Sequence, residues 1–323
     1  MLDLQNRGID YLRVSVTDRC NLRCVYCMPE EGVAPVEHDE ILTYEEIIRI
    51  CECASQLGIR KIKLTGGEPL VRRGFPSLVR ALKELPLIEQ VTLTTNGVLL
   101  GDFLDELVEA GLDAVNISLD TLDEERYEVL TRRVGLNRAA ASVFAALEKN
   151  IKVKINTVPI RELNSGGFRD IVLLAKNNPI DVRFIELMPI GYGKQLTPVK
   201  SEEIKREIQE HFGTLIPFDG VRGNGPAVYY SLAGFQGKIG FINAVSHEFC
   251  GTCNRVRLTA NGFLKLCLNH NTGISLKEPL RAGADNEELI GLMDTAISNK
   301  PLRHDFGREN TDTETKAMSQ IGG

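Results

Sequence analysis

Six of the eight cysteines in this 323-residue chain lie in two short trios, one near each end. Cys20, Cys24 and Cys27 have the spacing C-x3-C-x2-C, and Cys250, Cys253 and Cys267 have the spacing C-x2-C-x13-C. Cysteines this close together usually share a metal. Structural zinc takes four ligands, and a four-iron cluster usually has four cysteines. Each trio therefore suits a 4Fe–4S cluster with one iron left open, and the chain must fold so that it holds two such clusters.

The composition is that of an ordinary globular protein, with 43% apolar and 25% charged residues. No apolar run reaches about 18 residues, so no membrane span is expected. The first 14 residues lack a basic-then-apolar signal, which predicts a cytoplasmic protein. Thiols in the cytoplasm bind metal more often than they form disulfides. The net charge of −6 argues against non-specific binding of nucleic acid.

Strand-like and helix-like patterns alternate along the first two thirds of the chain. Runs rich in Val, Ile, Leu and Thr predict strands at residues 12–17, 61–65, 91–95, 114–119, 152–158 and 182–187. Six strands with helical crossovers predict parallel pairing. An open doubly wound sheet would also fit. Polar and glycine-rich motifs follow nearly every strand, however, as at the active-site end of a βα barrel. The sequence therefore predicts an α/β fold, an incomplete (β/α)6 barrel of the TIM type.

The alternation of strand-like and helix-like patterns ends at about residue 189. A Gly-, Pro- and Asn-rich stretch at 220–226 is followed by strand-like runs at 227–232, 238–242, 255–259 and 263–268, which carry the second trio. We expect a partial barrel over residues 1–225 and a β-containing extension over residues 226–323 that closes the barrel mouth.

The first trio resembles the cluster loop of the radical S-adenosylmethionine superfamily, with Tyr26 before the last cysteine. The resemblance implies a 4Fe–4S cluster whose open iron binds the amine and carboxylate of S-adenosylmethionine. The alternative from the residues alone is a zinc site completed by His38. The predicted strand ends carry further motifs, among them Gly66-Gly67-Glu68, in which two glycines permit close backbone approach. The expected contacts to S-adenosylmethionine are Tyr26, Gly66, Gly67, Glu68, Ser118 and Met188.

The second trio is followed by Arg255 and Arg257, which alternate along a predicted strand and so face the same side. A zinc site with His247 or His270 as the fourth ligand fits the cysteine spacing as well. Two guanidiniums beside a metal site are better suited to clamping an anion than to packing in a core.

With these motifs in order, the whole chain resembles the GTP 3′,8-cyclases, the molybdenum cofactor biosynthesis protein A family. The shared pattern is the N-terminal cysteine loop, C-x2-C-N-R-x-R-L-T with a later cysteine, and a terminal Gly-Gly. The resemblance implies that the open iron of the second cluster binds the guanine of GTP. It also implies that Gly322 and Gly323 enter the active site. The implied GTP contacts are Arg13, Lys63, Thr94, Lys154, Arg183, Arg255, Val256 and Arg257.

The family reaction implies the remaining expectations. Cleavage of S-adenosylmethionine gives a 5′-deoxyadenosyl radical, which takes hydrogen from C3′ of GTP. The C3′ radical then adds to C8 and gives 3′,8-cyclo-7,8-dihydro-GTP, the first step of molybdenum cofactor biosynthesis. The implied partners are a flavodoxin- or ferredoxin-like electron donor and a downstream cyclic-pyranopterin-forming enzyme, and a homodimer is left open. Two alternatives are another twin-cluster radical enzyme, such as a peptide-modifying maturase, and a zinc-stabilised nucleotide-binding protein.

Overall fold

The computed structural model describes residues 1–322 except 35, 248, 307–313 and 315. The six predicted strands are present as neighbours in one sheet, each parallel to the next. They are β1 (Tyr11–Ser15), β2 (Lys61–Thr65), β3 (Gln90–Thr95), β4 (Ala114–Ser118), β5 (Lys152–Thr157) and β6 (Asp181–Ile185). The predicted incomplete barrel is confirmed.

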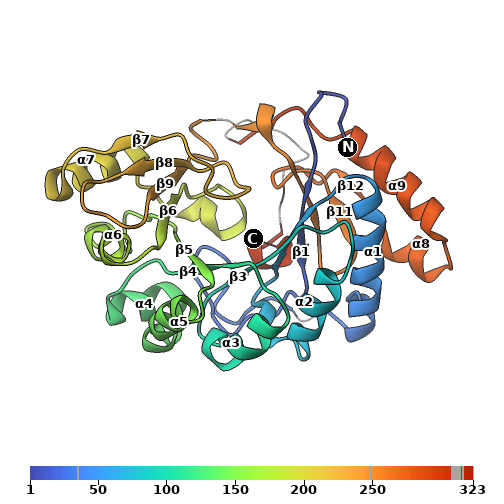
Figure 1. The fold of residues 1–323 in the computed structure, drawn as a ribbon, viewed down its shortest axis with the longest axis horizontal. Coiled ribbons are helices and arrows are strands. Elements are labelled where there is room, and N and C mark those ends of the chain that lie inside the picture. Colours follow the sequence, from blue (N-terminus) through green and yellow to red (C-terminus); the bar gives the residue numbers. More distant parts are fainter. Residues whose placement is uncertain (35, 248, 307–313, 315, 323) are drawn as a thin grey trace.

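Helices form an outer layer around these strands (Figure 1). They are α1 (Tyr44–Gln56), α2 (Phe75–Lys83), α3 (Leu100–Glu109), α4 (Glu124–Thr131), α5 (Leu136–Glu148) and α6 (Phe168–Asn177). Helix α1 begins at a capping box, in which Thr43 accepts from the backbone N of Glu46 and the Glu46 carboxylate accepts from the backbone N of Thr43. The apolar faces of the helices cover the outer side of the sheet, so the inner side and the strand ends remain for polar side chains.

The second part of the chain extends the sheet at both edges. Strand β9 (Ile239–Ile242) pairs parallel with β6, and β10 (Arg255–Leu258) pairs parallel with β1. Eight parallel strands therefore lie side by side. Antiparallel strands complete the edges, with β11 (Phe263–Lys265) and β12 (Gly273–Ser275) beyond β10, and β8 (Val228–Ser231) and β7 (Ile216–Phe218) beyond β9. The described part of the sheet is open, and the predicted β-containing extension is built into its two edges.

Three further helices accompany this part: α7 (Ser201–Phe212), α8 (Lys277–Arg281) and α9 (Asn286–Ser298), with α9 beside α1. The red C-terminal segment returns to the centre of the molecule (Figure 1) and ends with the short helix η5 (Met318–Gln320). A domain boundary near residue 225 stays a prediction. Among the described helices, none has the length and apolar character that crossing a membrane requires.

Candidate active site

The first trio lies in the loop that leaves β1, and the glycine turn after β2 packs directly against this loop. The backbone N of Gly67 donates to the Thr17 carbonyl at 2.7 Å, and the backbone N of Glu68 donates to the Arg19 carbonyl at 2.8 Å. A Cβ on Gly67 would lie 2.3 Å from the Arg19 carbonyl oxygen, and one on Gly66 would lie 2.6 Å from that of Thr17. The close approach that these glycines allow is therefore the approach of the cysteine loop to β2.

Glu68 is completely buried and holds the same region together. Its carboxylate accepts from Thr95 Oγ1 at 2.8 Å, from the backbone N of Asn96 at 2.7 Å and from the backbone N of Leu70 at 3.1 Å. Burial raises the pKa of Glu68 to about 7. Asn96 in turn directs its Nδ2 to Cys20 Sγ at 3.8 Å. The predicted contact of Glu68 with an ammonium group stays a prediction.

The three thiols of the first trio are neighbours in a buried site. Burial raises the pKa of Cys20 to about 11 and that of Cys27 to about 12, and it raises the pKa of Cys24 well above the ordinary thiol value. The charges of Cys27 and Cys20 add to the shift at Cys24. Iron binds the thiolate form, so a cationic cluster would offset this cost. The donor set therefore fits a three-cysteine cluster.

The described residues contain no group of three or more His, Cys, Asp or Glu side chains placed to hold a single metal ion. A tetrahedral zinc site would bring four such ligands around one ion. The histidines proposed as fourth ligands of the second trio also lie elsewhere. His247 is exposed beside Asn243 and Ser246, and His270 Nε2 lies 3.0 Å from the Arg303 carbonyl oxygen. Neither histidine therefore completes a zinc site at the second trio. The side chain of His38, the fourth ligand considered for the first trio, lies outside the described part of the structure.

Tyr26 joins the first trio to the ends of two strands through Asp120, which the sequence reasoning did not single out. The Tyr26 hydroxyl donates to Asp120 Oδ2 at 2.7 Å, and the backbone N of Val158 donates to Asp120 Oδ1 at 2.7 Å. Burial raises the pKa of Asp120 to about 6. Its place directly after β4 was the available signal, because carboxyl ends of parallel strands form the active-site face of such barrels.

A cavity of ≈ 270 Å³ is lined by the second trio and by Tyr26 of the first cysteine loop. The predicted residues that line it are Arg13, Tyr26, Thr94, Ser118, Met188, Cys250, Cys253, Arg255, Arg257 and Cys267. It is also lined by Asp120, Asn156, Glu186, Lys300 and Met318, which the sequence did not point to. Val256 is 1% exposed and belongs to the core, because it alternates with the two arginines along β10. A contact of Val256 with substrate would therefore use its backbone.

The inner strand faces gather positive charge. Lys63 is 7% exposed and has no hydrogen-bond or ion-pair partner within the described part of the chain. Burial, together with the charges of Arg183 and Arg13, holds its pKa well below the ordinary lysine value. Burial and the charges of Arg13 and Arg255 likewise hold the pKa of Arg257 well below the ordinary arginine value. Buried cations of this kind call for an anionic ligand.

The two other predicted cations of the barrel have partners. Arg183 Nη2 donates to Asn156 Oδ1 at 2.5 Å, and Lys154 Nζ lies 3.9 Å from Asp181 Oδ2.

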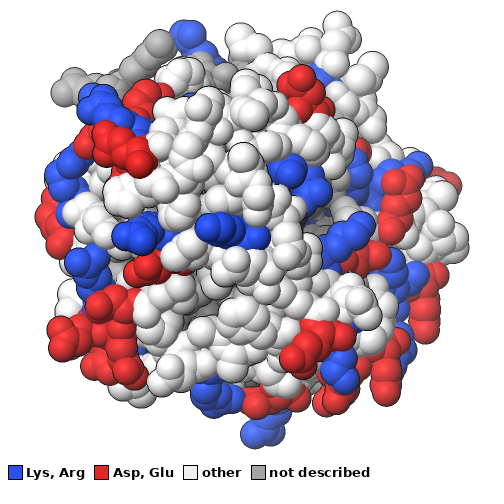
Figure 2. All heavy atoms as spheres, turned by 60° about the vertical axis from the view of Figure 1, so that its left-hand side comes forward, with Lys and Arg blue, Asp and Glu red and all other residues white. Residues whose placement is uncertain are grey.

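The charge inside the barrel also differs from that of the surface. On the face drawn in Figure 2, basic and acidic side chains are intermixed rather than separated into broad regions of one sign.

The second trio is held by the turn η4 (Cys250–Thr252) and by Cys267 after β11. Burial by itself would raise the pKa of Cys253, but the charges of Lys300 and Arg255 lower it to about 7. The Arg255 guanidinium also lies over the Phe249 ring, 5.0 Å from the centroid. This trio is therefore surrounded by cations, whereas the first is flanked by carboxylates.

The tail reaches the site from the other side. Arg257 Nη1 donates to the Gly322 carbonyl at 2.8 Å, and Met318 lines the cavity. A buried ion pair of 2.6 Å between Lys265 Nζ and Glu314 Oε2 holds the segment before it. Gly322 thus contacts an arginine that lines the cavity. Its entry into the active site stays a prediction, and Gly323 lies outside the described residues.

Comparison with known proteins identifies the family. Residues 14–175 match the family described as the radical SAM superfamily, and residues 180–306 match Molybdenum Cofactor Synthesis C. A GTP 3′,8-cyclase of Clostridium perfringens is 48% identical over the full length of both chains, and one of Syntrophomonas wolfei is 46% identical, again over both full lengths. The chain belongs to the GTP 3′,8-cyclase family. It is thereby a member of the radical SAM superfamily.

Solved structures agree at the level of the fold. The structure of Streptococcus suis SuiB bound to precursor peptide SuiA aligns with 98% of this chain with a TM-score of 0.62, and the alignment spans 72% of the SuiB chain. The structure of SuiB bound to S-adenosylmethionine aligns with 88% of this chain with a TM-score of 0.59, and the alignment spans 67% of the SuiB chain. The identities are 15% and 18%, so the likeness shows a common fold alone. The family membership separates this chain from the maturase alternative.

Proposed function

We propose that this protein converts GTP to 3′,8-cyclo-7,8-dihydro-GTP, the first step of molybdenum cofactor biosynthesis. The single observation that carries the proposal is the cavity lined by the second trio and by Tyr26 of the first cysteine loop, into which arginines and a lysine project from β1, β10 and the segment after α9. The second trio would bind the purine and the cations the triphosphate, and the first trio would serve radical generation.

Cys20, Cys24 and Cys27 would hold a four-iron cluster, and with S-adenosylmethionine bound this cluster would supply the 5′-deoxyadenosyl radical for hydrogen abstraction at C3′ of GTP. Tyr26, Ser118 and Met188 line the cavity beside this trio and orient the adenosyl and methionyl groups. Asp120 fixes the Tyr26 hydroxyl and thereby the cysteine loop. Gly66, Gly67 and Glu68 position this loop against β2 and shape the amine subsite.

The second half of the cavity binds GTP. Arg13 lines this cavity, whereas Lys63, Lys154 and Arg183, on β2, β5 and β6, are not among its described lining residues. These buried cations hold the triphosphate, since phosphate oxygens accept charge-assisted hydrogen bonds from ammonium and guanidinium groups. Arg255, Arg257 and the backbone at Val256 orient the nucleotide beside the second trio, with Thr94 on the ribose side. The Gly322-Gly323 tail follows Arg257 into the site. Apolar residues Ile185, Leu187 and Ile242 line the cavity and exclude water from the radical steps.

The proposal also includes the partner proteins and the cell compartment. An external flavodoxin- or ferredoxin-like protein supplies the electron, and a cyclic-pyranopterin-forming enzyme takes the product. The protein works in the cytoplasm, where its thiols stay reduced.

Anaerobic reconstitution tests this function. We expect about eight irons per chain from two four-iron clusters, and cleavage of S-adenosylmethionine that GTP stimulates. With GTP deuterated at C3′, the label should appear in 5′-deoxyadenosine, whereas GTP deuterated at C5′ serves as the matched control. A colourless protein with stoichiometric zinc, or a label that stays in GTP while cleavage proceeds, would contradict the proposal.

A further inference from the structure

A buried guanidinium in the N-terminal segment takes part in neither the cysteine motifs nor the proposed GTP contacts. Arg7 is 5% exposed, and its Nε donates to Asp3 Oδ2 at 2.6 Å. Asp3 Oδ1 accepts from the backbone N of Arg7 at 2.9 Å and from that of Gln5 at 3.0 Å, so the carboxylate is fixed before it pairs. A buried ion pair alone says little about function. The informative feature is where the other N–H groups of Arg7 go.

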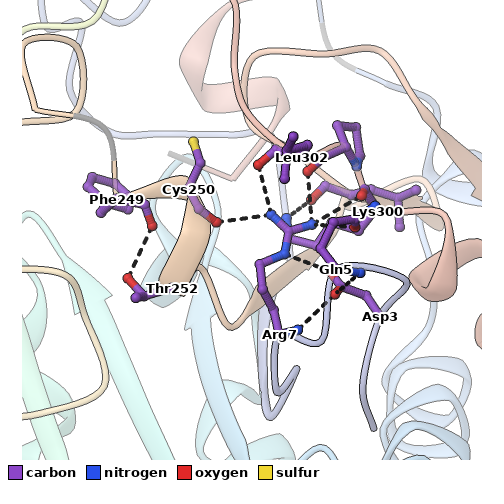
Figure 3. Close-up of polar contacts among 10 residues, drawn as sticks. Asp3, Gln5, Arg7, Phe249, Cys250, Thr252, Lys300 and Leu302 are labelled. Atoms are coloured by element: carbon purple, nitrogen blue, oxygen red, sulfur yellow. Dashed lines mark hydrogen bonds and ion pairs between the residues drawn. The ribbon is translucent and has the colours of Figure 1, made fainter.

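Those groups reach two segments that are far away in the sequence (Figure 3). Nη1 donates to the carbonyl oxygen of Cys250 at 3.0 Å and to that of Leu302 at 3.1 Å. Nη2 donates to the carbonyl oxygens of Lys300 at 3.1 Å and Pro301 at 2.9 Å. One side chain therefore ties the turn of the second trio to the segment after α9.

Both segments carry groups that face the second cluster site. The Cys250 carbonyl also accepts from the backbone N of Cys253 at 3.2 Å, so Arg7 binds the oxygen that closes the turn between two of the three cysteines. Lys300 is 3% exposed and lines the cavity, and its charge acts on both Cys253 and Cys267. The backbone that Arg7 holds is thus the backbone from which a cation that acts on these thiols extends.

We propose that Arg7 is a positioning residue for the second cluster. It sets the distance between the turn at Cys250 and the charge of Lys300, and so governs how firmly the second cluster is held and how much positive charge surrounds it. This inference rests on the proposed function, since it concerns the cluster assigned there.

The chemistry of the side chain explains why arginine stands here. Guanidinium offers five N–H donors in a planar fork, and at Arg7 they serve Asp3, the side-chain oxygen of Gln5 and four backbone carbonyls. Lysine could keep the charge and pair with Asp3. It has a single nitrogen with three donors, however, and cannot span the two segments. Arg7→Lys therefore removes the connection while it retains the ion pair.

The test isolates the second cluster. In the full chain with Cys20, Cys24 and Cys27 replaced by Ala, all bound iron reports on the second trio. After anaerobic reconstitution we measure the rate of iron release to a chelator and the electron paramagnetic resonance spectrum of the reduced cluster, both with and without GTP. Arg7→Lys should speed iron release about tenfold or more, in the range known for residues that support metal ligands. It should also change the spectrum.

Two further variants make the result specific. Arg60→Lys is the matched control, because Arg60 Nη1 also donates to two backbone carbonyls, those of Ser55 at 2.7 Å and Ile59 at 3.1 Å, and neither belongs to a cysteine trio or to the segment after α9. It should release iron at the rate of the parent. Asp3→Asn leaves the guanidinium and its carbonyl contacts in place, and should speed release less than Arg7→Lys.

The outcomes distinguish a failure of the proposed second cluster from a failure of the role proposed for Arg7. If the chain with Arg7 and without the first trio holds no iron, the proposed second cluster fails and this inference falls with it. If that chain holds about four irons and Arg7→Lys changes neither the release rate nor the spectrum, the inference alone is wrong. Equal acceleration by Arg7→Lys and Arg60→Lys would reduce Arg7 to a general stabilising residue and would also overturn it.

Discussion

Replacing Lys154 by Met should make the GTP-free protein more stable and its complex with GTP weaker. Lys154 Nζ lies 3.9 Å from Asp181 Oδ2, but Asp181 already pairs with Arg222 Nη2 at 2.6 Å. Removal of the Lys154 charge therefore leaves no carboxylate unpaired. Methionine has a similar length and packs without an ammonium group.

The magnitude follows from the pKa of this lysine. Burial, reinforced by the charge of Arg183 and only partly opposed by Asp181, lowers the pKa of Lys154 from 10.5 to about 8. That difference corresponds to about 3 kcal/mol of unfavourable free energy for the charged form at pH 7. Because the side chain is 13% exposed, relaxation and water reduce the gain, and we expect about 1–3 kcal/mol. In a chain of this size that is a rise of about 2–5 °C in the unfolding midpoint.

The pH dependence has a definite sign. Between about pH 8 and 10.5 the unfolded chain binds the proton more tightly than the folded chain, so the stability of the parent rises with pH in that window. The advantage of Lys154→Met should therefore be complete at pH 7 and should shrink as the pH rises from about 8 towards 10.5. Bound triphosphate favours the charged lysine, so GTP should stabilise the parent more than the variant.

The assay is anaerobic thermal unfolding from pH 6 to 10, with and without GTP, in buffers free of phosphate. Equilibrium dialysis gives the GTP affinity, which should fall about tenfold or more for the loss of one charged hydrogen bond to phosphate. A variant that is less stable than the parent at pH 7, or an advantage that does not change with pH, would refute the reasoning about burial. Unchanged GTP affinity would refute the role in binding.

Three other variants test separate parts of the site. Cys27→Ala should lower the iron content from about eight to about four per chain and abolish 5′-deoxyadenosine formation, measured by chromatography; retained cleavage would contradict the cluster assignment. Arg257→Ala should leave that cleavage in place but raise the Kd for GTP about tenfold or more, and an unchanged Kd in dialysis would exclude the clamp. Gly67→Ala brings a Cβ to 2.3 Å from the Arg19 carbonyl oxygen, so it should destabilise the protein by about 1–3 kcal/mol and release iron from the first trio, whereas Gly291→Ala, with nothing within 4 Å of its Cβ, should do neither.

Several features of the fold were predictable because they depend on short stretches of sequence. The runs that became β1 to β6 are largely buried and are rich in Val, Ile, Leu and Thr, so their composition identifies them without any partner. The start of α1 is equally local, because Thr43 and Glu46 form its capping box within one turn. The cysteine trios were visible because ligands of one metal site often lie close in the sequence.

The pairing of the later strands was not predictable in this way. Nothing near β9 or β10 indicates that they attach to opposite edges of the barrel, since that choice depends on contacts with β6 and β1, which are distant in sequence. The interpretation of the Gly66-Gly67 turn also changed. The turn was expected to face a ligand, and in the structure its two glycines face the cysteine loop.

The sequence by itself determined the two cysteine trios, the arginine pair after the second trio and the parallel barrel, and with them the family. These are local patterns of residue type and spacing. Only the tertiary structure decided that Asp120 holds Tyr26, that Lys300 faces the second trio, and that Arg7 joins the turn at Cys250 to that lysine. Such contacts bring together residues up to 295 positions apart. Their partners are mostly backbone carbonyls, which every residue carries, so residue types alone cannot indicate them.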